Sequence, residues 1–462
     1  MKTLALVLPL SASAFTFTVK APSNSTGPEV CSPCYEKPPA CTGSETSVQI
    51  TGVTGDFCSP LCVQNECPKG DGSFTAKPSC VLETQGSSKP TQCALICTPG
   101  ANGACPAGAT CQAIQGEGIC TYPSSETEFT KIAAEVNAMA DATWTADPKA
   151  SERFGSLDDV KQLCGTWNKN HPAFSSNSID APTYVKLPVN SALEAAGKAA
   201  LAAGTLPSDY DARTAHPNCT VISKIRDQSA CGSCWAFGST ESFEDRRCIA
   251  TGVDTMFSTE DTAGCCKGLF CGFSNGCNGG QPSAALKWMA LEGVVTGMGW
   301  FDDKKGTSCK PYTLQPCAHH VPASSKYPAC PSAEYSLTCA KACESEYTAR
   351  TYEADKIKGV KAYSVSSVEA MQTAIMTGGP LAVAFTVYAD FPTYKSGVYT
   401  HKSGSALGGH AVEMIGWGVD AGTAYWTVKN SWNEQWGDGG TFKIARGTNE
   451  CGIEDDVSAI DF

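Results

Sequence analysis

Cysteine constrains this chain more than any other residue type. The sequence of 462 residues contains 27 cysteines, and twelve of them fall within residues 31–120. A protein kept in a reducing compartment rarely carries so many thiols, so we expect an oxidising compartment and a framework of disulfides. The segment has few long apolar runs, so packing alone cannot stabilise it. We therefore predict a small disulfide-rich module over residues 15–123.

The function of this module stays open. Twelve cysteines are consistent with complete pairing, but their connectivity cannot be read from their spacing. Three interpretations remain: a spacer or a module that binds a protein ligand, a glycan-binding module, and a metal site. Residues 31–120 contain no histidine, which makes the metal site the least favoured.

Residues 1–14 have the pattern of a signal peptide. Lys2 supplies the basic start, residues 3–10 the apolar stretch, and residues 12–14 the small side chains of a cleavage site. No later apolar run approaches the roughly 18 residues that a membrane-spanning helix needs. Sequons at Asn24 and Asn218 fit the same route. We expect a glycoprotein of the secretory pathway, either extracellular or delivered to a lysosome or vacuole, with no membrane span.

Composition excludes two further classes of protein. Hydrophobic residues make up 42% of the chain, which is enough for a core and argues against wholesale disorder. The formal net charge of −12 argues against binding to nucleic acid or to an anionic membrane surface.

Composition also divides the rest of the chain. Apolar residues at helical spacing predict a helix over residues 125–141, and a second helix is predicted over residues 156–163. A loosely patterned stretch follows, to about residue 204. Residues 124–205 are therefore typical of a cleavable pro-region, although an interdomain linker would look similar. Residues 206–462, with 14 cysteines and seven of the nine tryptophans, must hold the main core.

Cys234 lies where a helix is predicted to begin. After Gly232 the chain has no proline or turn signal until Thr251 and Gly252, where glycine can end the helix. The helix dipole and the free N–H groups of a first turn stabilise a thiolate. Three other interpretations remain: a structural half-cystine, and a redox pair or a zinc pair with Cys231.

His410 and Asn430 lie on two strand-like runs, residues 410–415 and 425–430, joined around Asp420. Each is ten residues from Asp420, so a symmetric hairpin would place them roughly opposite one another, unless a bulge shifts the pairing. Alone, His410 could be a core histidine. Together, a thiol at a helix N-terminus, an imidazole and an orienting amide are the nucleophile, base and orienting group of acyl transfer.

These motifs resemble those of the papain family of cysteine peptidases, over roughly residues 125–462. The resemblance implies an α+β, two-lobed fold in which a helical lobe begins with the Cys234 helix. A β-barrel-like lobe would carry His410 and Asn430, with a cleft between the lobes. The motifs that carry it are Gln228 and the stretches 231–235, 277–280, 408–411 and 430–432.

The resemblance also implies a role for each residue of the site. Cys234 would attack the scissile carbonyl, His410 would protonate the leaving amine, and Asn430 would orient the imidazole. The Gln228 side chain and the Cys234 backbone N–H would stabilise the oxyanion. No cofactor or metal is implied, and the partners are protein and peptide substrates. The residues implied to line the substrate site or to shield it are Gly279, Gly280, Gly409 and Trp432.

The spacing of the motifs indicates an insertion. The histidine and the asparagine lie 176 and 196 residues after Cys234, against roughly 130–150 in the family. Residues 309–343 resemble the occluding loop of cathepsin B-like members. In such a loop His319 and His320 would bind the C-terminal carboxylate of a peptide, and Asp227 would hold the loop by pairing with His319. The adjacent histidines could instead indicate a metal site, but they lack suitably spaced acidic partners.

A second ion pair that holds this loop in the family is predicted to be missing. Its acidic position, just before Trp436, is Gln435, and its basic partner is at best Lys326. The resemblance therefore implies dipeptidyl carboxypeptidase activity with a generous endopeptidase component. Asp456 would lie at the floor of the S2 pocket, which receives the P2 side chain, and would accept arginine as well as bulky apolar groups.

The family's disulfides, carried over position by position, leave Cys234 free for chemistry and Cys451 as a buried free thiol. The segment from Trp144 to Thr166 resembles the family's pro-region, which would block the cleft until it is removed near Leu206. The implied pairs are Cys219–Cys248, Cys231–Cys277, Cys265–Cys339, Cys266–Cys271, Cys309–Cys343 and Cys317–Cys330.

We therefore predict a cysteine peptidase zymogen. The alternative is a secreted matrix or adhesion protein in which the cysteine-rich module dominates function and the peptidase domain is inactive or ancillary. Inactive relatives lose the nucleophile, whereas Cys234, His410 and Asn430 are all present. Deleting residues 31–120 and assaying both peptidase activity and localisation would separate the two.

Overall fold

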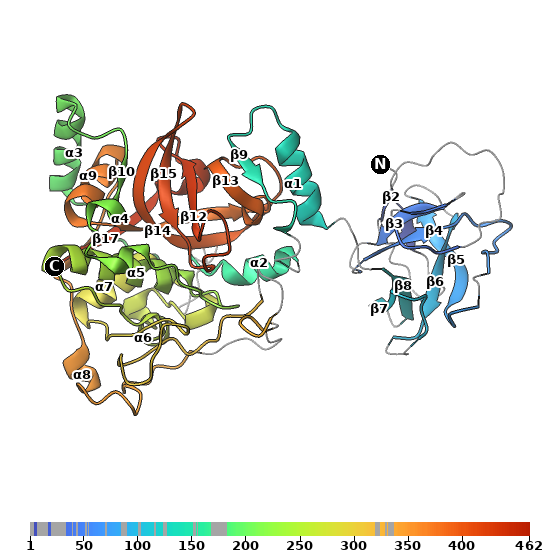
Figure 1. Ribbon diagram of the computed structural model, residues 1–462, viewed down its shortest axis with the longest axis horizontal. Helices are drawn as coiled ribbons and strands as arrows, with labels where there is room; N and C mark the ends of the chain where they lie inside the picture. The colour runs from blue at the N-terminus through green and yellow to red at the C-terminus, as the bar shows by residue number, and fades with distance from the viewer. Residues whose placement is uncertain are drawn as a thin grey trace. The chain divides into compact units, whose positions relative to one another are not determined.

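The computed structural model describes the chain except for residues 1–3, 7–16, 20–33, 39, 43–44, 51–52, 54, 70–71, 85–89, 100–102, 115–116, 123–126, 151–153, 155, 168–182, 319–323, 329 and 331–336. The described residues form two compact units, Met1–Thr127 and Glu128–Phe462, each with its own sheets and core (Figure 1).

The first unit is built from short antiparallel strands. One sheet has the order β1-β5-β6-β8-β7 and the other the order β2-β3-β4. Its apolar core is small and includes Val48, Phe57, Leu82 and Ile119. The strands are β1 (Leu4–Leu6), β2 (Phe17–Val19), β3 (Thr46–Ile50), β4 (Asp56–Ser59), β5 (Lys77–Thr84), β6 (Gln92–Cys97), β7 (Thr110–Ile114) and β8 (Glu117–Thr121).

Disulfides supplement this small core, which confirms the predicted framework. Two groups of three sulfur atoms lie close together in this unit, but every cysteine of both groups is in a disulfide. A half-cystine offers no thiolate to a metal ion, so these groups do not support the metal interpretation. Cys34 is also disulfide-bonded. The pairs described are Cys41–Cys58, Cys62–Cys80, Cys67–Cys93, Cys97–Cys111 and Cys105–Cys120.

The second unit has a helical lobe led by α5 (Cys234–Thr251), which begins and ends where the sequence predicts. Gly252 follows with φ of 72°, the left-handed conformation of a helix C-cap. A Cβ on Gly238 would lie 2.9 Å from the Val412 carbonyl oxygen, so this glycine lets the helix approach the sheet closely. The other elements here are α4 (Ala212–Ala215), η3 (Thr220–Ser223), α6 (Thr259–Cys265), η4 (Leu269–Cys271), η5 (Gly276–Asn278), α7 (Pro282–Leu291) and α8 (Tyr352–Asp355).

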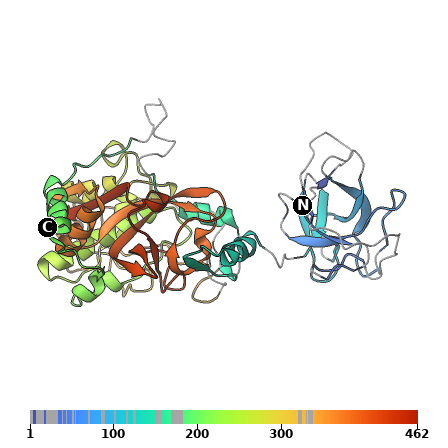
Figure 2. The same ribbon diagram turned by 90° about the horizontal axis from the view of Figure 1, so that it is seen from above.

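The other lobe is a nine-stranded sheet of order β11-β17-β12-β14-β15-β16-β13-β9, with β10 beside β14. Figures 1 and 2 show these strands gathered on one side of the unit and α5, α6 and α7 on the other, as the two-lobed α+β prediction requires. Its elements are β10 (Tyr210–Asp211), β11 (Lys361–Ser364), α9 (Val368–Gly378), β12 (Leu381–Tyr388), η6 (Phe391–Thr393), β13 (Tyr394–Tyr399), β14 (Ala406–Asp420), β15 (Thr423–Lys429), β16 (Thr441–Ala445), η7 (Glu450–Gly452) and β17 (Asp456–Asp461).

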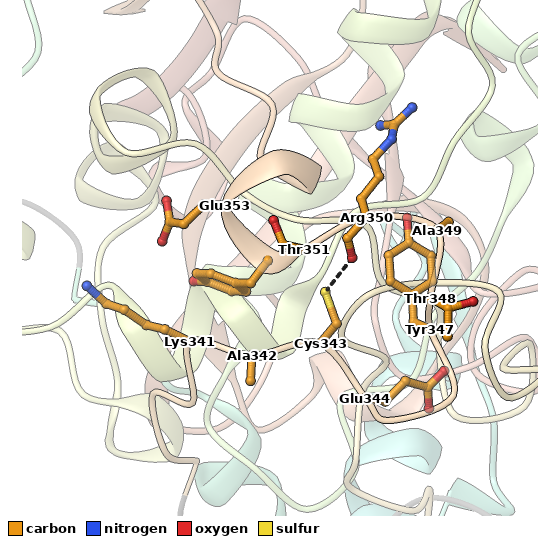
Figure 3. Close-up of a pocket in the computed structure, with 11 residues that line it drawn as sticks. Lys341, Ala342, Cys343, Glu344, Tyr347, Thr348, Ala349, Arg350, Thr351 and Glu353 are labelled. Carbon is orange, nitrogen blue, oxygen red and sulfur yellow. Dashed lines mark hydrogen bonds between the residues drawn. The ribbon is translucent and has the colours of Figure 1, made fainter.

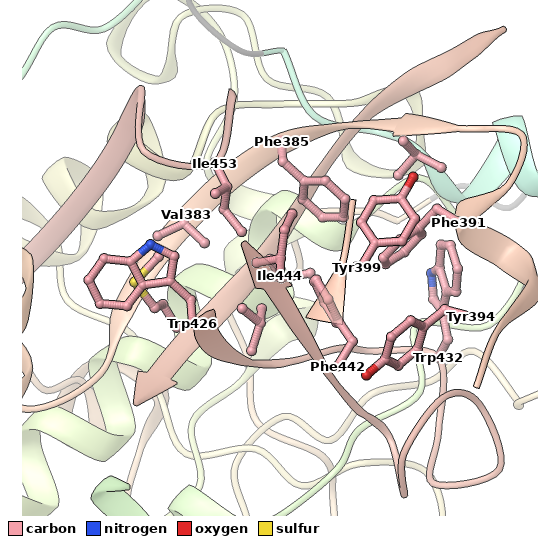
Figure 4. Close-up of a cluster of buried hydrophobic side chains, with 14 of the residues drawn as sticks. Val383, Phe385, Phe391, Tyr394, Tyr399, Trp426, Trp432, Phe442, Ile444 and Ile453 are labelled. Carbon is pink, nitrogen blue, oxygen red and sulfur yellow. The ribbon is translucent and has the colours of Figure 1, made fainter. Parts of the chain in front are cut away.

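Aromatic side chains fill the core of this lobe (Figure 4). The ring of Phe391 lies 4.9 Å from that of Phe442 and 5.8 Å from that of Trp432, measured between centroids. Edge-to-face pairs of this kind add to the free energy gained by burying the rings. This aromatic layer therefore packs against the strands that carry the site residues and holds them in place.

β14 and β15 form the predicted hairpin, but in a different register. Its turn is Ala421 and Gly422, with φ of 47° and 87°, which suits a two-residue connection. The register then shifts between Met414 and Gly416. The bulge that the sequence left open is thus present, and β15 ends at Lys429, so Asn430 lies just beyond the ladder rather than directly opposite His410.

The predicted helices of the pro-region are present as α1 (Glu128–Ala138) and α2 (Leu157–Leu163), and β9 (Trp144–Ala146) joins the sheet beside β13. Ser156 caps α2 by accepting a hydrogen bond from the Asp159 backbone N–H. No helix among the described residues is long and apolar enough to cross a bilayer.

The stretch before residue 204, which was predicted to have no regular pattern, contains a helix. α3 (Ser191–Ala203) is capped by the Asn190 side chain and ends at Gly204, which has φ of 65°. Both cap signals are visible in the sequence, but the alanine-rich helix has no apolar stripe to reveal it. α3 packs on α9, and a Cβ on Gly197 would lie 2.6 Å from the Ala370 backbone nitrogen.

Candidate active site

Cys234 is fully buried at the start of α5. Burial by itself would raise the pKa of its thiol, but the positive charge of His410 and hydrogen bonding with His410 and Thr166 outweigh it, and the pKa lies below its ordinary value. Thr166 Oγ1 lies 3.1 Å from Cys234 Sγ. Because Cys231 is bonded to Cys277, a redox or zinc pair with Cys234 is excluded. Cys234 is itself a free cysteine, which excludes the half-cystine interpretation.

His410, also buried, lies on β14, and its Nε2 is 2.8 Å from Asn430 Oδ1. With Nε2–H donating to the amide oxygen, Nδ1 is the ring nitrogen left for the thiol. The indole of Trp432 covers the imidazole, with ring centroids 4.8 Å apart, and is itself fully buried. The imidazole is thus held in one orientation, in a place from which water is excluded.

Gln228 is held beside the thiol by a neighbouring hydroxyl. Ser431 Oγ donates to Gln228 Oε1 at 2.8 Å, which turns the amide nitrogen toward the Cys231–Cys234 loop. Gln228 Nε2 donates to the carbonyl oxygens of Cys231 at 2.7 Å and of Leu163 at 2.9 Å. The Leu163 carbonyl therefore accepts a hydrogen bond from the amide group that was predicted to stabilise an oxyanion.

Residues 165–167 cross the site between two glycine-lined walls. On one side, Gly280 N–H donates to the Gly165 carbonyl, and Trp167 N–H donates to the Gly280 carbonyl, both at 2.9 Å. On the other side, Thr166 N–H donates to the Gly409 carbonyl at 2.9 Å. A Cβ on Gly280 or on Gly409 would lie 2.5 Å or less from neighbouring atoms. The glycines that were predicted to bind a substrate therefore bind the backbone of residues 165–167 of the same chain.

Gly279 borders the same wall. Its φ is 108°, and a Cβ there would lie 2.6 Å from Trp167 Nε1. Substitution at this position would therefore strain the backbone and displace the indole.

Asp456 lies at the start of β17, with 3% of its surface exposed. It faces Ala384 on β12, and Ala384 in turn faces Ala411, the neighbour of His410. The OH of Tyr184 donates to Asp456 Oδ1 at 3.0 Å. This row of three strands brings the predicted S2 carboxylate into the neighbourhood of the imidazole.

The predicted loop 309–343 is closed by Cys309–Cys343 and contains Cys317–Cys330. His319 and His320 lie outside the described residues. Asp227 accepts hydrogen bonds from the Ser229 N–H at 2.7 Å and from Asn433 Nδ2 at 2.9 Å.

The prediction that the loop lacks its second ion pair is wrong. Lys326 Nζ lies 3.9 Å from Glu434 Oε1, so the residue before Gln435 supplies the carboxylate. Both side chains are more than half exposed, at 51% and 68%. The carboxylate lies one residue before the position that the family's pattern assigns, so the pattern alone did not point to Glu434.

The remaining family disulfides are all present. Cys451 is a free thiol that is half-buried rather than buried, and Cys164 is also free. The pairs are Cys219–Cys248, Cys231–Cys277, Cys265–Cys339 and Cys266–Cys271.

A separate hollow lies where this loop ends and the next segment begins, lined by Lys341–Glu344 and Tyr347–Glu353 (Figure 3). None of the predicted site residues lines it. Two residues that were not predicted from the sequence contact the candidate active site: Tyr184 and Gln281. Gln281 directly follows the glycine pair, but Tyr184 could be found only from its contact.

Residues 206–460 match the family model described as papain family cysteine protease. The chain is 51% identical over 255 residues to cathepsin B-like cysteine proteinase 5 of Caenorhabditis elegans, covering 54% of this chain and 72% of that protein. It is 42% identical over 328 residues to a cathepsin B-like cysteine proteinase of Schistosoma japonicum, covering 70% and 88%. Among solved structures it resembles procathepsin B S9 of Trypanosoma congolense, with a TM-score of 0.56 and 28% identity over 73% of this chain and 98% of that one.

Proposed function

This chain belongs to the papain family of cysteine proteases and is a cathepsin B-like zymogen, and from this premise we propose that Cys234, His410 and Asn430 form its catalytic site. The observation that carries the proposal is the 2.8 Å contact of His410 Nε2 with Asn430 Oδ1 beside the Cys234 thiol, whose pKa is lowered.

The mechanism follows from these positions. The Cys234 thiolate attacks the carbonyl carbon of the scissile peptide, and Gln228 Nε2–H and the Cys234 N–H donate to the oxyanion that forms. His410 transfers its Nδ1 proton to the leaving amine. It then removes a proton from the water that hydrolyses the thioester. Asn430 keeps the ring oriented through both steps.

Residues 124–205 act as the inhibitory pro-region in this proposal, and cleavage near Leu206 frees the cleft. Support comes from the backbone bonds that residues 165–167 make with Gly280 and Gly409, since a substrate needs the same groups. N-terminal sequencing of the mature enzyme tests the position of the cut.

Dipeptidyl carboxypeptidase activity accompanies endopeptidase activity in this proposal. His319 and His320 would bind the substrate's terminal carboxylate, and Asp227 would hold the loop in place. Arginine and bulky apolar side chains would bind at P2, with Asp456 at the floor of the S2 pocket. The Lys326–Glu434 pair adds a second, exposed contact to the loop, so the endopeptidase component should be smaller than Gln435 alone indicates.

The module of residues 15–123 would bind a protein or glycan ligand in the extracellular space or in a lysosome or vacuole. The disulfides and the family support passage through the secretory pathway. The predicted signal peptide of residues 1–14 and the two sequons support it as well. An adhesion function dominated by the module is the alternative. Deleting residues 31–120 should leave peptide hydrolysis intact if the peptidase is the main activity.

The decisive experiment compares thiol labelling with activity in the mature enzyme. Iodoacetamide should modify Cys234 first and abolish hydrolysis in proportion, because burial and the neighbouring Glu450 carboxylate raise the pKa of Cys451. Cys234→Ala should fold and be inactive. Equal labelling of Cys234 and Cys451 would contradict the proposed nucleophile.

A further inference from the structure

The pro-region holds one of its own tyrosines on the buried acid of the S2 pocket. Tyr184 OH donates to Asp456 Oδ1 at 3.0 Å, across 272 positions of sequence. Burial and the charge of Asp456 raise the pKa of Tyr184, so its phenol stays protonated and remains a donor.

The backbone on either side of this tyrosine is clamped by one buried side chain. Val185 N–H donates to Gln281 Oε1 at 2.8 Å, and Gln281 Nε2 donates to the Thr183 carbonyl at 2.9 Å. A third bond, from Gln281 Nε2 to the Gly272 carbonyl at 3.1 Å, fixes the amide itself. The backbone on both sides of the tyrosine is thus fixed, and in the structure its ring reaches the Asp456 carboxylate.

This clamp belongs to the same wall as the active site. Gln281 follows Gly280, whose backbone pairs with residues 165–167 beside Cys234. Asp456 sits in the strand row that includes Ala411, next to His410. The Tyr184 side chain therefore reaches from a backbone segment held by Gln281, beside the glycine wall, to the Asp456 carboxylate on the other lobe.

We propose that Tyr184 mimics a substrate side chain, and that the mature enzyme selects tyrosine over phenylalanine at P2 because Asp456 accepts the phenol hydrogen bond. This inference rests on the proposed peptidase function and narrows its substrate class. A phenylalanine in the same place would desolvate the carboxylate without giving it a donor, and a site built to bind a hydroxyl discriminates against the analogue that lacks one.

Two fluorogenic dipeptides that differ only in tyrosine or phenylalanine at P2 test the proposal on the mature enzyme. We expect kcat/KM to favour tyrosine by about tenfold, as a hydrogen bond to a charged acceptor typically does. Asp456→Ala should bring the ratio close to one. Asp455→Ala, which removes the exposed neighbouring carboxylate, should leave the ratio unchanged.

A second measurement uses the zymogen and needs no change to the S2 pocket. Tyr184→Phe should shorten the lag before activity appears by several-fold, whereas Lys186→Ala, at an exposed position nearby, should not. Equal turnover of the two dipeptides by the wild type, or a preference that survives Asp456→Ala, would overturn the inference. Failure to hydrolyse either dipeptide would instead overturn the proposed function.

Discussion

Lys429 Nζ lies 2.6 Å from Glu413 Oε2, both side chains are buried, and Lys429 directly precedes Asn430 in the chain. Asp245 lies 3.5 Å from the same ammonium, and Arg226 pairs with Glu244 at 2.6 Å nearby. With Glu241 the group contains four carboxyl groups against two cations, all of them buried. Not every carboxyl can therefore be ionised at low cost in free energy.

This excess of acid predicts that the enzyme is most stable at acidic pH. Burial raises the pKa of Glu241 to about 7 and that of Glu244 to about 8, from 4.5. From about pH 4.5 upward, the unfolded chain releases protons that the folded chain keeps. The free energy of unfolding then falls by about 1.4 kcal/mol per pH unit for each such group, until the folded pKa is passed.

Thermal melting at several pH values between 5 and 8 checks this prediction. The melting temperature should fall as the pH rises, and Glu241→Gln should make the fall shallower. Glu292→Gln, at an exposed position, serves as the control. A melting temperature that is constant or rises toward pH 8 would contradict the assignment.

Gln228→Ala should lower kcat by about 10²–10³, the usual effect of removing one donor to an oxyanion. Ser431→Ala should have a smaller effect, because Ser431 acts only by orienting the Gln228 amide. Steady-state kinetics on one fluorogenic peptide gives both values. A KM effect without a kcat effect for Gln228→Ala would assign the residue to substrate binding instead.

Blocking the C-terminal carboxylate of a peptide as an amide should slow dipeptide release well below the rate for the free acid. The difference should be largest at mildly acidic pH, where histidine is protonated and binds a carboxylate best. Mass spectrometry of the products follows both rates. Equal rates for acid and amide, together with no effect of His320→Ala, would leave a plain endopeptidase.

Glu434→Gln should increase the endopeptidase share of total activity, because it removes the carboxylate that pairs with Lys326. An exposed pair of this kind contributes about 0–1 kcal/mol, which limits the increase to several-fold. The ratio of internal to terminal cleavage of one peptide measures it. Glu353→Gln provides a matched change elsewhere on the surface, and a similar increase there would remove the case for a latch.

Gly197→Val should destabilise the zymogen by roughly 1–3 kcal/mol, because the new side chain meets the backbone of α9 at the α3–α9 contact. Ala196→Val, at the exposed position beside it, should cost much less. Denaturant unfolding of the zymogen compares the two variants. Similar costs for both would mean that β-branching in the helix, rather than the α3–α9 contact, decides the effect.

Local sequence determined the parts of this protein that depend on nearby residues. The α5 helix begins at Cys234 and ends before Gly252 because its boundary signals lie within a few positions of its ends. α1 and α2 follow from apolar spacing and from the Ser156 cap. The short motifs around Cys234, His410 and Asn430 also identified the family, since each keeps its own spacing whatever the rest of the chain does.

Only the tertiary structure decided the contacts between distant segments. β14 lies between β12 and β15, and the bulge between Met414 and Gly416 decided a register that the sequence had left open. Tyr184 meets Asp456, and Lys326 meets Glu434, across more than a hundred positions. Side chains that far apart in sequence are brought together by strand order and loop path, which no local pattern of residues encodes.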